Sequence, residues 1–469
     1  MSLQTKEEIL SRPVLTTFFK HTFVSLIGLM ALTTANVVDG IFIGKYVGAQ
    51  GLAAISLLLP YVTLLVALSL MLAIGASVSI GTFMGKGDTE SSSALFTQVL
   101  IVTVALNTCL ALVSYIAEPV LFWLLYIPAD IVPLAREYFS IIRWVFILQF
   151  PCMVLYYLVR ADGYTKLATV ALVVGALVNI VLDMAFVGYL DYGISGAAYA
   201  TALAQGTQCL LLLMYFRDKD RVLTLSMFNK PWRRIARVVK NGLSEFTNEV
   251  SVGVLFLVIN TLMVMRAGSE GVAAYSVVNY LIFLSVMVSF GIADAMHLLV
   301  SYNRGAKNND RVSDFLSVAL GTSILLGLVV SACLVFYGEV IVGVFLDSSD
   351  HQTAYFAINI MAIMWPLFLV NGCNILLSVF LTAIEKPFES AAIALCRSVV
   401  LPVGLLAATF HFVWSVSLFG DIEPTISFLI ALPAAEWLTL CFAVFLIRKS
   451  YKSNQGFEDG FDKGQNVKL

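Results

Sequence analysis

Twelve long apolar segments constrain this sequence more than any other feature. Each runs for about 20 residues or more without the alternation of a barrel strand, which is enough to cross a bilayer as a helix. Of the 469 residues, 59% are hydrophobic and 12% are charged, whereas soluble domains carry about 25% charged residues. We therefore expect an all-α membrane protein with twelve transmembrane helices. The expected spans are 14–43, 52–82, 93–116, 138–159, 167–187, 194–216, 243–265, 272–300, 313–336, 354–383, 388–410 and 425–447.

Lysine and arginine residues gather on one side of these expected spans. If both termini are cytoplasmic, all but five of the 28 Lys and Arg residues fall in the tails and inner loops. Cytoplasmic segments of membrane proteins carry such an excess of positive charge, so the sequence predicts that both termini are cytoplasmic. The five exceptions are Lys45, Arg136, Arg143, Arg266 and Arg397.

The two halves of the chain resemble each other in sequence. Residues 48–85 align without gaps on residues 268–305, at an offset of 220 positions. Six spans is an even number, so both halves enter the membrane from the same side. This parallel arrangement is typical of secondary transporters. Identical pairs include Gly48/Gly268, Gly51/Gly271, Ala53/Ala273, Ala54/Ala274, Ser56/Ser276, Ser69/Ser289, Ala73/Ala293 and Gly85/Gly305.

A basic connection separates the two halves. Residues 217–241 contain eight Lys and Arg residues, which we interpret as a topology anchor that touches anionic headgroups. The connection is short and tethered to the bilayer, so we do not expect nucleic-acid binding. The predicted domains are an N-terminal six-helix lobe at 1–216, a C-terminal six-helix lobe at 242–450 and a cytoplasmic tail at 451–469.

Two carboxylates lie inside the expected spans of the first half. An ionisable side chain at bilayer depth costs roughly 2.5–3.5 kcal/mol, so such residues usually mark a functional site. Asn179 and Asp183 are one helical turn apart on one face, and Asp39 and Thr201 fall in the same outer layer by the helical rise. Their oxygens suit a hard cation such as Na⁺, and a carboxylate can instead carry a proton. We predict one cation or proton site formed by Asp39, Asn179, Asp183 and Thr201.

Less specific interpretations of these four residues remain open at this point. Asp39 and Asp183 could be interfacial residues near helix ends, and Asn179 and Thr201 could make ordinary hydrogen bonds between helices. The repeat favours a specialised first half, because Asp39 falls on Ile259 at the offset of 220. The region that corresponds to Asp183, residues 401–406, contains no acid.

Acidic residues also lie near the expected inner face. Glu245 and Glu249 begin the seventh span, and Asp294 comes late in the eighth. These three acids could form an inner gate, or they could pair with Arg304 and Lys307.

Three further charges lie within or beside the spans. We expect Arg143 to pair with an acid from another span. Arg397 and Glu436 lie mid-span, where a mutual or structural pairing and a contact with substrate are both open.

The sequence contains no convincing signature of soluble catalysis. It has no GxxxxGK[ST] phosphate-binding loop, which argues against ATP as the energy source. No His, Asp or Glu cluster has the spacing of a metal enzyme. We therefore expect a protein that is not an enzyme, needs no cofactor and uses an ion gradient.

Several motifs make a family resemblance specific. They are VVDGIFIG at 37–44, GLAA at 51–54, the pair Asn179 and Asp183, GISGAAYAT at 193–201 and SYNRG at 301–305. Over nearly its whole length the chain resembles the multidrug and toxic compound extrusion (MATE) transporters, and among them the prokaryotic DinF-like or MepA-like branch.

The resemblance implies a V-shaped pair of six-helix lobes around a central cavity. It also implies export of organic, often cationic, amphipathic compounds in exchange for H⁺ or Na⁺. In the DinF-like branch an acid on the first span, an Asn/Asp pair on the fifth and a Thr on the sixth hold the coupling ion. These match Asp39, Asn179, Asp183 and Thr201, and Asn36 lies one turn before Asp39 as a neighbour.

The chain departs from a second branch of that family. That branch uses acids on the seventh and tenth spans. Glu249 answers to the first of these, but Asn371 stands near the place of the second. We therefore do not expect a cation site in the second half.

Two other functions remain as alternatives. A flippase for lipid-linked saccharides would need a cationic cavity, whereas the candidate residues here are acidic or neutral. A channel or receptor would need no duplicated halves. We expect small-molecule drugs or metabolites and the lipid bilayer as partners, no nucleic acid, and a monomer in the plasma membrane of a bacterium or archaeon.

Overall fold

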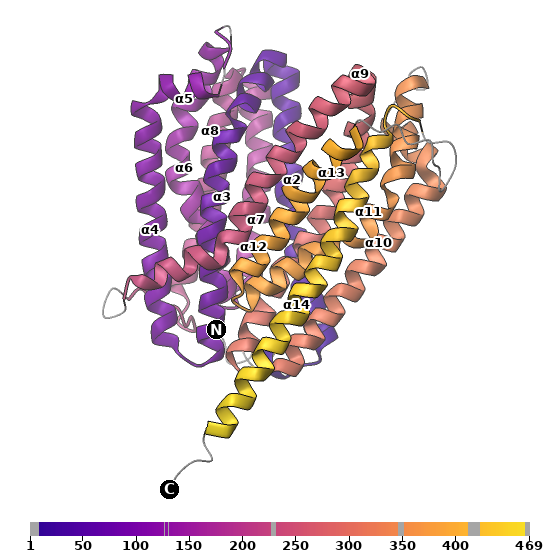
Figure 1. Ribbon diagram of the computed structural model, residues 1–469. Helices are drawn as coiled ribbons and strands as arrows, with labels where there is room; N and C mark the ends of the chain where they lie inside the picture. Colours follow the sequence, from indigo (N-terminus) through magenta and orange to yellow (C-terminus); the bar gives the residue numbers. More distant parts are fainter. Residues whose placement is uncertain are drawn as a thin grey trace. The chain divides into compact units, whose positions relative to one another are not determined.

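The computed structural model describes residues 9–125, 127–129, 131–226, 231–345, 351–410 and 423–464. Within these residues the regular structure is helical, and twelve helices are long and apolar enough to cross a membrane (Figure 1). The prediction of an all-α membrane protein with twelve spans is confirmed. The first six spans are built from α2 (Val14–Phe42), η1 (Ile43–Val47), α3 (Ala49–Gly85), α4 (Thr89–Ile116), α6 (Val132–Ala161), α7 (Thr165–Asp183), η2 (Met184–Tyr189), α8 (Gly193–Leu213) and η3 (Met214–Arg217).

The remaining spans follow after the basic connection. A short helix in the first half, α5 (Glu118–Leu124), links two spans and is not itself one. The later elements are α9 (Arg233–Gly305), α10 (Asn309–Phe345), α11 (His351–Ala383), α12 (Pro387–Leu395), η4 (Cys396–Val400), α13 (Leu401–Phe410), η5 (Ser427–Ile430) and α14 (Ala431–Gly464). Helix α9 contains two spans, which are separated at Gly268, where the backbone leaves the helical conformation.

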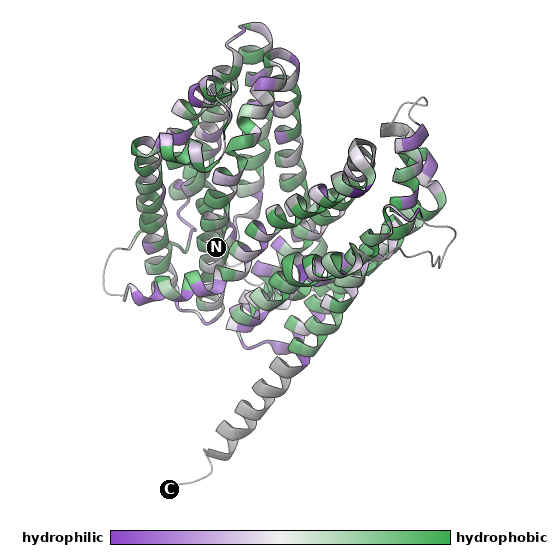
Figure 2. Ribbon diagram, turned by 45° about the horizontal axis from the view of Figure 1, so that its top comes forward, coloured by the Kyte–Doolittle hydropathy of each residue, from purple (hydrophilic) through white to green (hydrophobic). Residues whose placement is uncertain are grey.

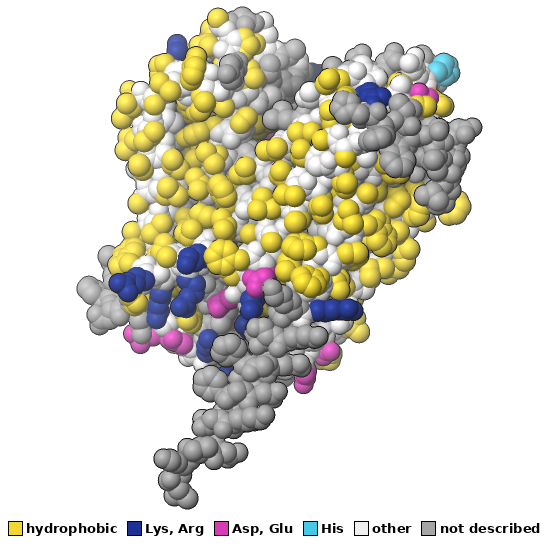
Figure 3. Space-filling view, viewed as in Figure 1, with side chains coloured by type: hydrophobic (Ala, Val, Ile, Leu, Met, Phe, Trp, Pro, Cys, Tyr) yellow, Lys and Arg dark blue, Asp and Glu magenta, His cyan; other side chains and the backbone are white. Residues whose placement is uncertain are grey.

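The outward faces of these helices are apolar. On α2, for example, Phe23 and Ile41 are mostly exposed, at 65% and 59%. Hydrophobic residues run along the helices in Figure 2, and hydrophobic side chains cover most of the face in Figure 3. Lys and Arg side chains gather at one end of the first-half helices in the same view. Helices that satisfy their own backbone hydrogen bonds and expose apolar side chains suit a lipid environment.

The chain forms two compact units that interleave in sequence. The first unit contains residues 1–250, 291–318 and 382–385, and the second contains residues 251–290, 319–381 and 386–469. The late part of α9 therefore packs with the first unit.

The sequence repeat is visible in the backbone. Residues with positive φ recur at corresponding turns of the two halves, where the chain reverses between neighbouring helices. Glycine adopts this conformation without the steric cost that a β-carbon brings. The corresponding positions are Gly48 and Gly268 (φ 93° and 62°), Gly87 and Lys307 (81° and 60°), and Gly163 and Glu385 (86° and 57°).

Two glycines that correspond in the repeat also touch each other inside the first unit. A β-carbon on Gly85 would lie 2.8 Å from the α-carbon of Gly305, and one on Gly305 would lie 2.9 Å from the α-carbon of Gly85. The neighbouring contacts also correspond. The β-carbon on Gly85 would lie 2.3 Å from the carbonyl oxygen of Tyr302, and the β-carbon on Gly305 would lie 2.3 Å from the carbonyl oxygen of Thr82. This reciprocal contact places a local two-fold axis between Gly85 and Gly305. Small residues allow such close approach of membrane helices.

The helices that carry the predicted site lie together in the first unit. Helix α7 packs against α2 and α8, and α6 packs against α3, α4 and α8. The α-helix of the first span gives way to the π-helical turn η1 soon after Asp39, and that of the fifth span gives way to η2 directly after Asp183. The two π-helical turns contact each other. Each predicted acid therefore lies just before an irregular turn, and such turns are frequent at functional sites.

Candidate ion-binding site in the first unit

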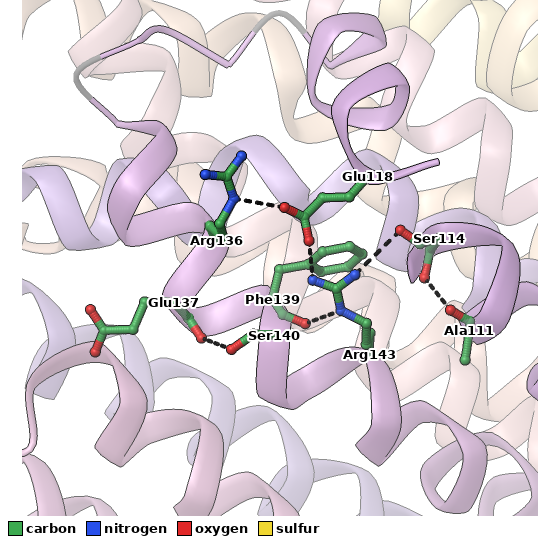
Figure 4. A network of polar contacts seen from close by, with 8 residues as sticks. All are labelled: Ala111, Ser114, Glu118, Arg136, Glu137, Phe139, Ser140 and Arg143. Atoms are coloured by element: carbon green, nitrogen blue, oxygen red, sulfur yellow. Dashed lines mark hydrogen bonds and ion pairs between the residues drawn. The ribbon is translucent and has the colours of Figure 1, made fainter. Parts of the chain in front are cut away.

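Arg143 is neutralised by an acid, as the sequence predicts, but this acid lies on the linking helix α5 and not on another span. Its side chain is 2% exposed, and its Nη2 atom pairs with a carboxylate oxygen of Glu118 (Figure 4). The other guanidinium nitrogens donate to the carbonyl oxygens of Phe139 at 2.9 Å and Ser114 at 3.3 Å. Arg136 pairs with the second oxygen of Glu118 at 2.7 Å. This network joins α4, α5 and α6 with its charges satisfied.

The Glu118 carboxylate should make folding sensitive to acid. Burial acts to raise its pKa, but the hydrogen bonds and charges of Arg143 and Arg136 outweigh burial and lower it. Because the pKa is lower in the folded chain, this contribution to stability is present above the usual glutamate pKa of about 4.3 and is lost as the pH falls through the folded value. We expect Glu118→Gln to lower the unfolding free energy at neutral pH by about 1.5–3 kcal/mol, as for a charged hydrogen bond.

Thermal melts of detergent-solubilised protein at several pH values would test this. The melting temperatures of the wild type and Glu118→Gln should converge as the pH falls through the lowered folded-state pKa of Glu118, because the wild-type glutamate then becomes protonated. Glu339→Gln, at an exposed position on α10, is the matched control and should follow the wild type throughout. A constant difference at all pH values would contradict the electrostatic account.

Asp294 is also neutralised, but not by the partners that its sequence neighbourhood suggests. Its carboxylate lies 2.9 Å from the Nη2 atom of Arg160, on α6, and this replaces the suggested pairing with Arg304 or Lys307. Arg160 also donates to the Tyr156 hydroxyl at 2.8 Å and to the Ser25 hydroxyl at 2.7 Å. All of these residues belong to the first unit. The pair joins α6 to the late part of α9.

The mid-span pair of the second unit is mutual. The Nε atom of Arg397 lies 3.1 Å from a carboxylate oxygen of Glu436, which confirms one of the two suggested interpretations. The other carboxylate oxygen of Glu436 accepts a 2.6 Å hydrogen bond from the Asn374 amide.

Asp39 and Asp183 differ from these three acids, because no basic residue pairs with them among the residues that the structure describes. Asp183 is fully buried, and neither of its carboxylate oxygens has a hydrogen-bond partner. The Oδ1 atom of Asp39 and the amide nitrogen of Asn179 are also buried without partners. Buried polar atoms are nearly always hydrogen-bonded in proteins. Four such atoms on neighbouring helices therefore indicate a place where a proton, ion or water belongs.

The two carboxyl groups lie close enough to act on one another. Asp39 and Asp183 interact electrostatically, and both act on Tyr138, which is 9% exposed on α6. The adjoining π-helical turns are also packed together, since a β-carbon on Gly188 would lie 3.5 Å from the Phe42 ring and 3.6 Å from the Tyr46 ring. Two like charges that are buried within electrostatic range of each other repel. A bound cation or proton would relieve both the repulsion and the missing hydrogen bonds.

The comparison with known proteins decides the family. The MatE family model matches residues 25–185 and 249–406, one match in each half and more than half of the chain in total. The chain belongs to the MATE family of transporters. The resemblance drawn from the motifs is therefore confirmed, and this MATE protein is a multi-pass membrane protein of a transporter family.

Two relatives of this MATE protein are named as multidrug proteins. It is 24% identical over 380 residues to "Probable multidrug resistance protein YoeA" of Bacillus subtilis, covering 78% of each chain. It is 22% identical over 398 residues to "Multidrug export protein MepA" of Staphylococcus aureus, covering 83% of this chain and 86% of that one.

Solved structures share the fold of this MATE protein. A structure described as the outward-facing conformation of a multidrug resistance MATE family transporter matches with a TM-score of 0.86 at 21% identity, over 96% of this chain and 98% of that one. A MATE structure in complex with MaD3S matches with a TM-score of 0.88 at 20% identity, over 97% of this chain and 100% of that one. The predicted fold class is thus confirmed.

The other predicted site residues of this MATE protein lie in different surroundings. Thr201 is half-buried on α8, which packs against α7 and η1, and its hydroxyl has no hydrogen bond among the described residues. Asn36 is exposed on α2. Glu249 lies on α9, where it interacts with Glu245, and Tyr157 is within electrostatic range of both Glu245 and Asp294. Glu249 and Asp294 therefore belong to a separate acidic region.

Sequence reasoning missed Tyr138. It lies on α6, six residues after the first residue of that span, Val132, and within electrostatic range of Asp39 and Asp183. The estimate of depth that placed Asp39 and Asp183 in one layer would also have selected Tyr138 if phenolic oxygens had been counted as possible ligands. Its hydroxyl can donate a hydrogen bond to a carboxylate or supply an oxygen to a cation.

Proposed function

We propose that this MATE protein is a secondary active exporter that moves organic, often cationic, amphipathic compounds outwards in exchange for H⁺ or Na⁺. One observation carries the proposal: Asp39, Asn179 and Asp183 present four buried polar atoms without partners. In contrast, three other acids, Glu118, Asp294 and Glu436, are neutralised by arginine, and the buried Asp162 accepts a hydrogen bond from Tyr215. Charges that only stabilise a fold are paired, as these three are. A membrane-embedded acid left unpaired suits reversible binding of an ion.

The coupling ion would act on the first unit through charge neutralisation. With both carboxylates ionised, the site contains two desolvated like charges, which favours hydration and looser packing. Protonation of Asp39 or Asp183, or Na⁺ held between their oxygens with help from Asn179 and Thr201, removes that cost. The two π-helical turns directly beyond the acids then provide the segment whose packing changes. Release of substrate outwards would follow this change.

The available energy is sufficient for useful export. One elementary charge that crosses the membrane potential yields about 2.3 kcal/mol per 100 mV. A factor of ten in concentration corresponds to about 1.4 kcal/mol, so one ion per cycle supports a gradient of roughly 50-fold at 100 mV for an electrically neutral substrate. A monovalent cation exchanged one for one moves no net charge, so its export is driven by the concentration gradient of the coupling ion. The same proposal places the protein in a bacterial or archaeal plasma membrane as a monomer. Both termini would lie in the cytoplasm, and the domain boundaries would fall at 216 and 242.

Proteoliposomes with independently imposed pH and Na⁺ gradients would test the function and identify the ion. We expect efflux of a fluorescent organic cation to follow one of the two gradients and to collapse when that gradient is dissipated. A matched preparation of Asp183→Asn gives the background. Transport down the substrate gradient alone, unchanged by either ion gradient, would contradict an antiporter and favour a channel.

A further inference from the structure

The second unit contains a charged group whose hydrogen-bonding capacity is only partly used. Arg397 donates from Nε to Glu436 at 3.1 Å, and its Nη1 and Nη2 atoms have no partner among the described residues. The Arg397 side chain is 11% exposed, so part of it is accessible. Its partner is held firmly, because Asn374 donates to a carboxylate oxygen of Glu436 at 2.6 Å and to the Glu436 carbonyl at 2.8 Å.

This guanidinium lies at membrane depth. Its span runs from Pro387 to Phe410, so Arg397 is about 15 Å along the helix from the first residue of the span. A guanidinium with open donors is unfavourable in hydrocarbon unless those donors meet water, a carbonyl or an anion. Arginine–carboxylate pairs are frequently bidentate, with two parallel N–H donors facing the two carboxylate oxygens. Arg397 instead engages Glu436 through Nε and leaves its outer edge open.

Two other observations point to a ligand here. Asn374 is fully buried, and its amide oxygen has no partner, so the network is incomplete even on its protein side. Arg397 also lies within the π-helical turn η4, in the middle of its span, and such turns are frequent at functional sites.

We propose that Arg397, oriented by Glu436, binds the carboxylate of zwitterionic compounds that the protein exports. The open Nη1 and Nη2 atoms supply two parallel N–H donors, which match the two oxygens of a carboxylate. Glu436 holds the guanidinium plane and keeps the empty subsite close to neutral, so organic cations are not excluded from the second unit. This subsite deepens the proposed function, because it names a substrate class for the same exporter.

A pair of dyes that differ only at a carboxylate would test the subsite. Tetramethylrhodamine methyl ester is a cation, and its free acid adds one carboxylate. Binding of each dye to detergent-solubilised full-length protein is measured by fluorescence anisotropy. The variant Arg397→Gln/Glu436→Gln removes both charges and leaves neither partner buried alone. We expect its affinity for the free acid to fall about tenfold and its affinity for the ester to stay within about twofold, with Arg397→Lys intermediate for the acid.

A second buried pair provides the matched control. Arg143→Gln/Glu118→Gln also removes an arginine–glutamate pair, and it should leave the ratio of the two affinities as in the wild type. Unchanged affinity of the Arg397/Glu436 variant for the free acid would overturn the subsite, and so would an equal loss for both dyes, which indicates a structural pair. The proposed exporter is judged separately, by ion-driven efflux of the ester and its dependence on Asp183.

Discussion

Asp183→Asn is expected to abolish ion-driven efflux and, at the same time, to raise the thermal stability of the protein. The carboxylate of Asp183 is fully buried without a hydrogen-bond partner, and Asp39 lies within electrostatic range. Asparagine has nearly the same shape but carries no charge, so the substitution removes both desolvation and repulsion. For an electrically neutral substrate, loss of one coupled charge should reduce the gradient by up to about 50-fold at 100 mV.

The opposite signs of these two effects make the prediction sharp. For a paired acid such as Asp294, the same substitution should lower the melting temperature, because it leaves Arg160 buried without its counter-charge. Asp191→Asn makes the identical chemical change on an exposed residue and should alter neither efflux nor stability. Efflux and melting temperature are measured on the same purified preparations. A less stable but fully active Asp183→Asn protein would show that the acid is structural.

Gly85→Ala and Gly305→Ala are expected to impair folding strongly and to similar degrees. At each position the new methyl group would lie 2.3 Å from a backbone carbonyl oxygen of the other helix, so only movement of the whole helix relieves the clash. Overpacking of this kind costs about 1–3 kcal/mol and can cost more where backbone must shift. The effects should match because the two glycines occupy corresponding positions and contact each other across the local two-fold axis.

Glycines with free space nearby give the control. A β-carbon on Gly206, in α8, or on Gly321, in α10, would meet nothing within 4 Å. Alanine at either position should be neutral or stabilise the helix by up to about 1 kcal/mol. The yield of monodisperse protein in detergent and its melting temperature are the measurements. A large difference in yield or melting temperature between Gly85→Ala and Gly305→Ala would argue against the reciprocal packing.

The spans and the repeat could be predicted from the sequence because they depend on local composition. A run of about 20 apolar residues must be a helix in a bilayer, wherever it packs. The correspondence of Gly48 with Gly268 survives as a shared left-handed backbone conformation, which glycine allows at low cost. Asn179 and Asp183 share a helix face by their spacing alone.

The partner of Asp294 was decided only by the tertiary structure. Arg160 and Asp294 are far apart in sequence, and they meet because the late part of α9 packs with the first unit. Tyr138 joins Asp39 and Asp183 in the same way, through the rotation of α6 about its own axis. Sequence spacing fixes the face and approximate depth of a residue on one helix. Which side chain stands opposite depends on how neighbouring helices rotate and slide, and that is set by the packing of all of them together.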